Sequence, residues 1–331
     1  MLGFVEITPW HWAGFVLCVL FFLALDLGLL HRRARVVKFR EAAGWTTLWF
    51  LLAMAFAVAL AKWRGHEESI QFTTGYLIEL SLSMDNVFVI AVIFAFFRIP
   101  PQYQHRVLFW GILGALVMRG VMILAGAALV QRFQWTLYLF GVFLLATGIK
   151  MLLVKEQGVR PDKNPLVRCA RKLFPVTPEL HGQKFVTVFE GRRMLTPLML
   201  VLLVVETTDL IFALDSIPAI FAVTTKPFIV FTSNVFAILG LRSLYFLLAG
   251  AIGYFRYLKV GLSVVLVFIG IKMLLDPHGR EPKGIQIEIP TNVSLMTVAT
   301  IILIAIVLSV MVAEREKRTG ANRAGSNQNP R

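Results

Sequence analysis

Two segments of this chain place acidic and other oxygen-bearing side chains inside long apolar stretches. In the first segment, Glu79 precedes Asp85 and Asn86 by about two helical turns. The second segment holds four residues of the same chemical kind: Glu206, Asp209, Asp215 and Ser216. A charge at the bilayer centre costs about 2.5–3.5 kcal/mol on insertion scales, so each carboxylate needs a partner or a task. Several carboxylates together indicate a pathway for cations.

The oxygen ligands in these segments indicate which metals would bind. The pairs Asp85-Asn86 and Asp215-Ser216 offer carboxylate, amide and hydroxyl oxygens. Such hard ligands suit magnesium, calcium or manganese better than copper or zinc. Met84 would add a thioether that favours manganese, although a methionine in a membrane helix also serves as plain packing. Three acids could be further ligands, proton carriers or partners of arginines: Glu79, Glu206 and Asp209.

Composition identifies the solvent around these residues. The chain has 331 residues, 57% of them hydrophobic, and a mean hydropathy of +0.74. These values are typical of a polytopic membrane protein. About nine apolar stretches are long enough to cross a bilayer, near residues 10–30, 42–63, 70–97, 107–130, 135–154, 197–222, 228–253, 258–275 and 292–313.

The net charge of +14 is distributed in a way that predicts topology. A dense basic run over residues 31–40 follows the first apolar stretch. The positive-inside rule therefore places the N-terminus outside and the C-terminus in the cytoplasm. The basic 155–196 loop then also faces the cytoplasm. Because the charge follows topology, we do not expect the protein to bind nucleic acid.

Two similar sequences predict an inverted repeat. Residues 148–153 and 270–275 both read Gly-Ile-Lys-Met-Leu-Leu, at the ends of the fifth and eighth stretches. Upstream, Arg119 matches Arg242, and Asp85-Asn86 matches Asp215-Ser216 in the same order. Each copy spans the membrane three times, so the second copy begins on the side opposite to the first. Inverted repeats place substrate sites near the midplane and permit alternating access.

Several other polar residues lie within the apolar stretches. Arg119 and Arg242 are expected to form structural or gating ion pairs, because a cationic substrate would avoid them. Asn234 could be a polar contact between helices. Asp26 lies near the inner end of the first stretch, where it could pair with the basic run.

Helical geometry limits how the acids can converge. Glu79 and Asn86 are seven residues apart and share a helical face, whereas Asp85 does not lie on that face. Pro218 leaves the Leu214 carbonyl without its usual donor, which predicts an interrupted helix beside Asp215.

Six regions follow from these patterns. They are an N-terminal two-helix segment (1–69), two three-helix repeats (70–154 and 197–275), the basic loop (155–196), an outer loop with a ninth helix (276–313) and a tail (314–331). Alternation around Glu190-Gly191 predicts a small hairpin in the cytoplasmic loop. The composition of the tail from Thr319 predicts disorder.

At these residues the chain resembles the TerC family of integral membrane proteins, and residues 25–32 resemble its Alx branch. The likeness extends from about residue 10 to 313 and rests on residues 79–86, 206–220 and 234–245. It implies a manganese exporter of the bacterial inner membrane, in a broader group of cation exporters built from inverted three-helix repeats. It also carries an older label of tellurium resistance. By residue match, the family's metal positions fall on Glu79, Asp85, Asn86, Glu206, Asp209 and Asp215.

The sequence therefore predicts an all-α exporter of divalent cations, manganese first, coupled to proton exchange. The partners would be the lipid bilayer, the transported Mn²⁺ and protons, with no organic cofactor. No Walker motif or His-Glu-x-x-His helix is present, so we do not expect an enzyme. The alternative is a membrane scaffold, assembly or stress-response protein in which the acids form structural ion pairs. The sequence leaves the oligomeric state open.

Overall fold

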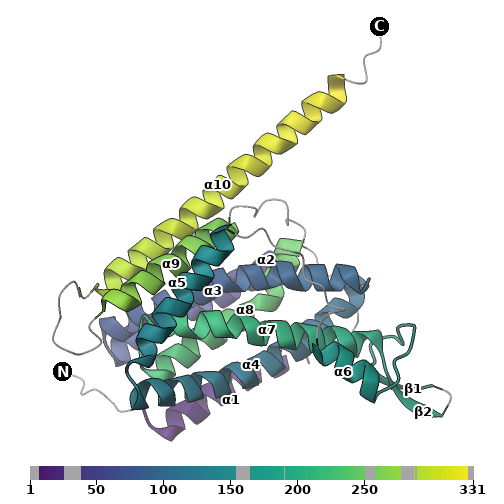
Figure 1. Ribbon diagram of the computed structural model, residues 1–331, viewed down its shortest axis with the longest axis horizontal. Helices are drawn as coiled ribbons and strands as arrows, with labels where there is room; N and C mark the ends of the chain where they lie inside the picture. The colour runs from purple at the N-terminus through teal and green to yellow at the C-terminus, as the bar shows by residue number, and fades with distance from the viewer. Residues whose placement is uncertain are drawn as a thin grey trace.

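The computed structural model describes residues 7–25, 39–153, 165–189, 191–249, 258–276, 287 and 289–326. This part of the chain forms a bundle of ten helices and one hairpin (Figure 1). The helices are α1 (Pro9–Leu25), α2 (Phe39–Trp63), α3 (His66–Phe96), α4 (Pro101–Arg132), α5 (Thr136–Leu153), α6 (Pro165–Leu173), α7 (Pro197–Phe221), α8 (Pro227–Ala249), α9 (Leu258–Leu275) and α10 (Thr291–Ser326). The prediction of an all-α membrane protein is confirmed.

Most of the helices have membrane-spanning dimensions. Within the described residues, seven are long and apolar enough to cross a bilayer: α2, α3, α4, α5, α7, α8 and α10. Helix α1 is apolar but shorter, and α9 has 18 residues. Each predicted apolar stretch corresponds to one helix, but nine crossings remain a prediction.

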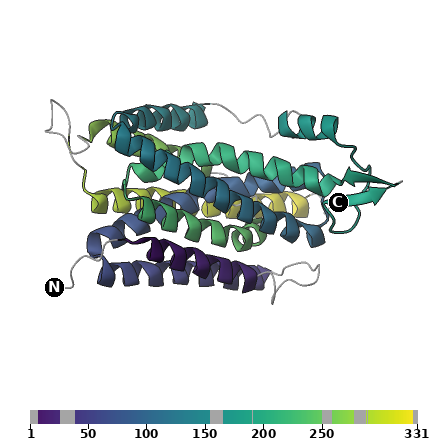
Figure 2. The ribbon, with the colours of Figure 1, turned by 90° about the horizontal axis from the view of Figure 1, so that it is seen from below.

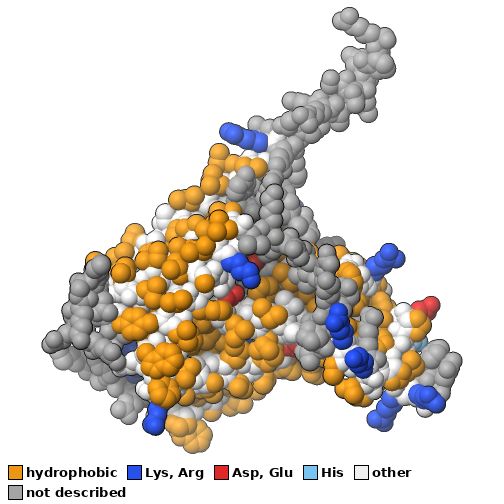
Figure 3. Space-filling model, viewed as in Figure 1, with side chains coloured by type: hydrophobic (Ala, Val, Ile, Leu, Met, Phe, Trp, Pro, Cys, Tyr) orange, Lys and Arg blue, Asp and Glu red, His pale blue; other side chains and the backbone are white. Residues whose placement is uncertain are grey.

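The outer surface of the bundle is apolar. Hydrophobic side chains cover its flank, while Lys and Arg side chains gather near one end (Figure 3). Val117 and Val121, one turn apart on α4, are 62% and 63% exposed. Exposed apolar side chains in such numbers are expected where lipid is the solvent.

Four helices form the centre of the bundle. Helix α3 contacts α7 and α8. Helix α7 contacts α3, α4 and α8, and α4 also packs against α8. Helix α2 covers α3 and α8, and α10 covers α3 and α9. Figure 2 shows α1 and α2 along one edge of the bundle. The contacts of α3–α5 resemble those of α7–α9, yet the inverted repeat itself stays a prediction.

The repeated Gly-Ile-Lys-Met-Leu-Leu sequence has a packing role. Its first residues, Gly148 in α5 and Gly270 in α9, both lie where these two helices meet. A Cβ on Gly270 would lie 2.8 Å from the Leu145 nitrogen and 2.9 Å from the Gly141 oxygen. A Cβ on Gly148 would lie 2.9 Å from the Ser263 oxygen. Small residues at these points permit close backbone approach, as in other membrane helix pairs.

The predicted hairpin is confirmed between α6 and α7. Strands β1 (Val186–Phe189) and β2 (Arg192–Leu195) pair antiparallel. Gly191 has φ +76°, a turn conformation that glycine adopts readily. The hairpin projects beyond the end of the bundle (Figures 1 and 2).

The C-terminal end differs from the prediction. Helix α10 continues to Ser326, so disorder does not begin at Thr319. Alanine and arginine, which favour helix, recur between residues 321 and 324. The final residues, 327–331, lie outside the described part of the chain.

Candidate functional site

A buried arginine organises the centre of the bundle. Arg119 on α4 is 2% exposed and donates two hydrogen bonds to Asp209 on α7. Its Nε lies 3.0 Å from Oδ2, and its Nη2 lies 2.9 Å from Oδ1. The same guanidinium donates through Nη1 to Glu79 Oε1 on α3. We call Arg119, Glu79 and Asp209 the central cluster.

The three residues of the central cluster come from three different helices, α3, α4 and α7. Helix α7 contacts both α3 and α4, so residues far apart in sequence converge on one guanidinium. Bidentate arginine–carboxylate pairing is strong and geometrically specific. Ser216 Oγ lies 3.5 Å from Arg119 Nη1, a longer and weaker contact.

The buried polar groups without a hydrogen-bond partner among the described residues include one on α3 and one on α8. One is the Glu79 oxygen Oε2, on a side chain with no exposed surface. The other is the whole amide of Asn234 on α8, which is also fully buried. Unsatisfied buried groups cost about 1–3 kcal/mol each and call for an explanation. The hydrogen bond that Asn234 was expected to make with another helix is therefore not found among the described residues.

A small cavity adjoins the central cluster. Its volume is about 20 Å³, enough for one water-sized species. Its polar wall is formed by Asn86, Thr208 and Asp209, and its other walls are apolar. Asn86 is 3% exposed, as expected for the face that it shares with Glu79.

Glu206 brings a third carboxylate to this region. It stands one turn before Asp209 on α7 and is partly buried. Its carboxylate lies against the backbone of α4, where a Cβ on Gly114 would overlap it. Glu206 and Asp209 are close enough for their charges to interact. The absence of a side chain at Gly114 thus creates the space that Glu206 occupies.

The other predicted ligands lie elsewhere. Asp215 is partly buried, hydrogen-bonds with Thr147 on α5 and lies near the charge of Lys150. Met84 and Asp85 are partly buried on α3. No group of three or more acidic, His or Cys side chains in the described residues is arranged to hold a metal. The predicted ligands therefore form no complete cage, and the metal assignment stays a prediction.

Three further predictions have different outcomes. Helix α7 runs unbroken from Pro197 to Phe221 with Pro218 inside it, so the predicted interruption was wrong. Pro218 stands in the last turn, where it removes one hydrogen bond without ending the helix. Arg242 was predicted to form a structural or gating ion pair. It lies on α8 and is 8% exposed, and its ion pairing stays a prediction. Asp26, predicted to pair with the basic run, lies outside the described residues.

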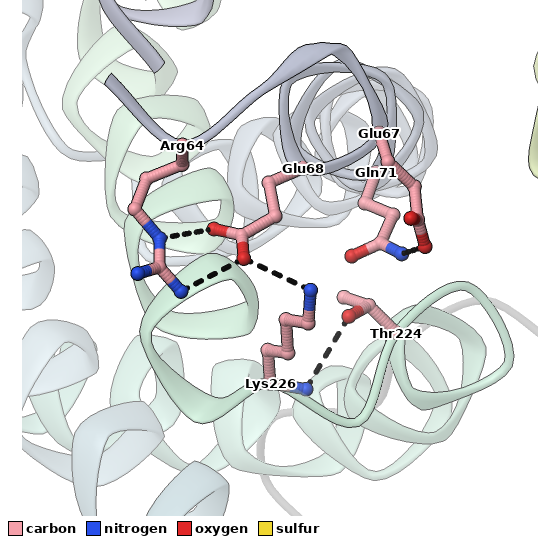
Figure 4. A network of polar contacts seen from close by, with 6 residues as sticks. All are labelled: Arg64, Glu67, Glu68, Gln71, Thr224 and Lys226. Atoms are coloured by element: carbon pink, nitrogen blue, oxygen red, sulfur yellow. Dashed lines mark hydrogen bonds and ion pairs between the residues drawn. The ribbon is translucent and has the colours of Figure 1, made fainter. Parts of the chain in front are cut away.

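A second charge cluster was missed in the sequence. Glu68 in the first turn of α3 accepts hydrogen bonds from Arg64 and from Lys226, which precedes α8 (Figure 4). All three distances are 2.9 Å. Bonding to Glu68 raises the pKa of Arg64. We call these residues the end cluster. The four-residue spacing of Arg64 and Glu68 was the available sequence signal.

Known proteins resemble this chain over most of its length. Residues 64–317 match the family described as "Integral membrane protein TerC family". An uncharacterized membrane protein of Myxococcus xanthus, STKORF319, is 52% identical over 95% of this chain and 96% of its own length. A "putative membrane-bound redox modulator Alx" of Salmonella typhi is 47% identical over 95% and 98%. The Alx protein of Escherichia coli (strain K12) is 46% identical over 88% and 93%.

No solved structure matches the chain. The family match covers more than half of the sequence, and the relatives align over nearly their full lengths with it. Every residue of the central cluster and of the end cluster falls within the matched range, which begins directly after α2. The chain is therefore a multi-pass integral membrane protein that belongs to the TerC family.

Proposed function

We propose that this protein exports a divalent cation from bacterial cells across the inner membrane, with manganese as the favoured substrate. The observation that carries the proposal is the charge balance at the centre. Two carboxylates, Glu79 and Asp209, bind the guanidinium of Arg119, and a third, Glu206, lies near Asp209. When all are ionised, the excess is two negative charges, which equals the charge of one divalent cation. Uncompensated charge inside the membrane is energetically costly, so charged residues retained there usually have a function.

The cavity beside Asp209 supplies a place for the ion. Asn86, Thr208 and Asp209 present the hard oxygen ligands that Mn²⁺, Mg²⁺ and Ca²⁺ accept. Arg119 already engages both oxygens of Asp209. An ion that binds there must therefore compete with the guanidinium. This competition makes Arg119 a gating residue, because cation arrival loosens the link between α4 and α7.

Export needs an energy source. Moving a divalent ion outward against 100 mV costs about 4.6 kcal/mol, from about 2.3 kcal/mol per charge. Proton exchange supplies it in this proposal, with Glu79, Glu206 or Asp209 as carriers. Alternating access between α3–α5 and α7–α9 would move the ion, with the N-terminus outside and the C-terminus in the cytoplasm. Metal efflux from proteoliposomes that ignores an imposed pH gradient would contradict the coupling.

The decisive experiment measures total cell manganese, magnesium, calcium, zinc and iron in a manganese-stressed host. The strains carry empty vector, wild type, Asp209→Asn, Asp85→Asn or Asp215→Asn at matched membrane abundance. Glu67→Gln is the control, since Glu67 lies in the first turn of α3 and contacts Gln71 there. We expect wild type and the control to lower manganese selectively, and Asp209→Asn to fail. Unchanged metal content with wild type would refute export.

The strains with Asp85→Asn and Asp215→Asn test the predicted metal ligands that do not line the cavity beside Asp209. Asp215 already has Thr147 as a hydrogen-bond partner. If Asp215→Asn abolishes export while Glu67→Gln does not, Asp215 joins the pathway in another conformation. If it has no effect, the ion passes through the cavity beside Asp209 without using Asp215.

A second candidate is a membrane scaffold, and the central cluster also favours it. A buried bidentate pair of Arg119 with Asp209 can hold helices together without transporting an ion. The matched pair Glu206→Gln and Glu67→Gln discriminates, because Glu206 makes no hydrogen bond with Arg119. A scaffold should tolerate both substitutions, whereas an exporter should lose activity with Glu206→Gln alone.

The Alx relatives carry the name redox modulator. The two cysteines of this chain, Cys18 on α1 and Cys169 on α6, form no disulfide with each other and are both exposed. A dithiol reaction of this chain therefore has no structural support. We propose that any redox effect follows from the cell's metal content, which the measurement above would detect first.

A further inference from the structure

A cleft of about 760 Å³ lies between the end of α3 and the loop after α6, and none of the residues of the central cluster lines it. This volume falls within the range of sites for small molecules. Its walls are Phe96, Phe97 and Arg98 at the end of α3, Val176 to Leu180 in the loop, and Pro197 and Leu200 at the start of α7.

The loop wall of the cleft is anchored by specific contacts. Val176 forms a bridge with Leu195 of β2. Thr177 donates its N–H to the Leu195 carbonyl at 2.9 Å and its hydroxyl to the Glu179 carbonyl at 3.0 Å. Phe96 and Phe97 stack edge to face, with ring centroids 5.2 Å apart. The loop wall is therefore fixed by its bonds to β2, and the α3 wall includes two aromatic rings packed against each other.

With the bilayer midplane taken between Glu79 and Asp85, as the proposed export site requires, the cleft falls near the depth of lipid headgroups. Arg98 follows the midpoint between Glu79 and Asp85 by about 16 residues, or roughly 24 Å at 1.5 Å per residue. Half of a bilayer with its headgroups measures about 20–22 Å. Phe96 is 51% exposed at the end of a helix long and apolar enough to span the membrane, so its ring is available to acyl chains. A phospholipid can thus reach the cleft from the membrane.

The polar wall carries one positive and one negative side chain. Arg98 and Glu179 are both exposed and, within the described residues, form no ion pair with each other. A guanidinium binds a phosphodiester through paired hydrogen bonds. A carboxylate complements a primary ammonium, which has three donors. The remaining lining is mainly apolar, including Val176, Leu180 and Leu200.

We propose that this cleft binds the headgroup of an ethanolamine phospholipid. Its phosphate would contact Arg98, its ammonium would contact Glu179, and its glycerol and upper acyl carbons would lie against Phe96 and the apolar lining. Phosphatidylglycerol would leave Glu179 facing an anion. Phosphatidylcholine would present an ammonium without N–H donors. The bound lipid would link the loop after α6 to the end of α3.

The test is native mass spectrometry of the purified full chain with added phosphatidylethanolamine, phosphatidylglycerol or phosphatidylcholine. We expect phosphatidylethanolamine to bind roughly tenfold more tightly than the other two, since one charge-assisted hydrogen bond is lost with each. Glu179→Gln should remove this preference, and Arg98→Gln should weaken all three lipids. Arg193→Gln, at an exposed position on β2 outside the cleft, should behave like wild type.

Three results would overturn the proposal. One is binding of phosphatidylglycerol as tight as that of phosphatidylethanolamine. Another is unchanged phosphatidylethanolamine binding in both Arg98→Gln and Glu179→Gln. The third is full competition by free phosphoethanolamine at equal concentration, which would identify a soluble ligand. Melting temperatures without added lipid establish that each variant is folded, so that a loss of binding reports on the cleft.

Discussion

The central cluster and the end cluster use the same chemistry with opposite charge balance. In the central cluster, Arg119 serves two carboxylates, Glu79 and Asp209. In the end cluster, two cations, Arg64 and Lys226, serve one carboxylate, Glu68. The first set has an excess of negative charge and the second an excess of positive charge. A cation is therefore favoured in the central cluster, whereas the three residues of the end cluster provide no excess negative charge to attract one.

The two clusters also differ in burial. The side chains of Arg119 and Glu79 are 2% and 0% exposed, whereas that of Lys226 is 45% exposed. Removing one partner of a buried pair leaves an uncompensated charge and costs about 3–5 kcal/mol. Exposed pairs contribute about 0–1 kcal/mol. The comparison predicts that substitutions in the central cluster will be the more damaging.

The largest effect is expected from Arg119→Met. It leaves Glu79 and Asp209 without their donor in the apolar core, so we expect a loss of about 3–5 kcal/mol in the free energy of unfolding. Titration of the purified protein with a denaturing detergent would measure it. The triple variant Arg119→Met, Glu79→Gln, Asp209→Asn removes all three charges and should recover most of this loss. A triple variant no more stable than Arg119→Met would contradict the account.

The second effect is expected from Glu68→Gln. This substitution keeps the size of the side chain but leaves Arg64 and Lys226 without an anion. We expect a loss of about 1–2 kcal/mol, less than at Arg119 because water reaches part of the cluster. The same detergent titration measures it, with Glu67→Gln as the neighbouring control. A loss as large as that of Arg119→Met would show that burial does not separate the clusters.

Gly114→Ala sharpens the comparison by moving one carboxylate without removing a charge. A Cβ at this position overlaps the Glu206 carboxylate, which must rotate away. Because Glu206 is a flexible side chain, we expect a stability change of about 1 kcal/mol or less but a clear loss of manganese export. Gly240→Ala is the control, since its Cβ would lie 3.8 Å from Trp49 Cβ, an ordinary contact. Full export by Gly114→Ala would place Glu206 outside the pathway.

The helices could be predicted because bilayer crossing requires about twenty apolar residues in succession. The predicted 70–97 and 197–222 stretches correspond to α3, His66–Phe96, and α7, Pro197–Phe221. Helical periodicity also predicted that Glu79 and Asn86 share a face, and both are buried. These features are local, so sequence spacing is enough to find them.

Pairing between helices could not be predicted in the same way. Arg119 contacts Glu79 and Asp209, which lie 40 and 90 residues away along the chain. Which acids reach it depends on how α3, α4 and α7 are rotated against one another, and spacing within one helix does not determine this. Lys226 and Glu68 are 158 residues apart, so the end cluster was missed for the same reason. The interruption at Pro218 was wrong because the adjacent turns keep their hydrogen bonds.

The smallest effect is expected from Lys226→Met, which tests the end cluster alone. Glu68 keeps both hydrogen bonds from Arg64 when Lys226 is removed. Since the Lys226 side chain is 45% exposed, its pair should contribute about 0.2–1 kcal/mol, decreasing as salt is added. Detergent titration at low and high salt would measure this, with Lys62→Met on α2 as a control. A salt-independent loss equal to that of Glu68→Gln would show that the pair of Lys226 with Glu68 is not the weak, exposed pair described here.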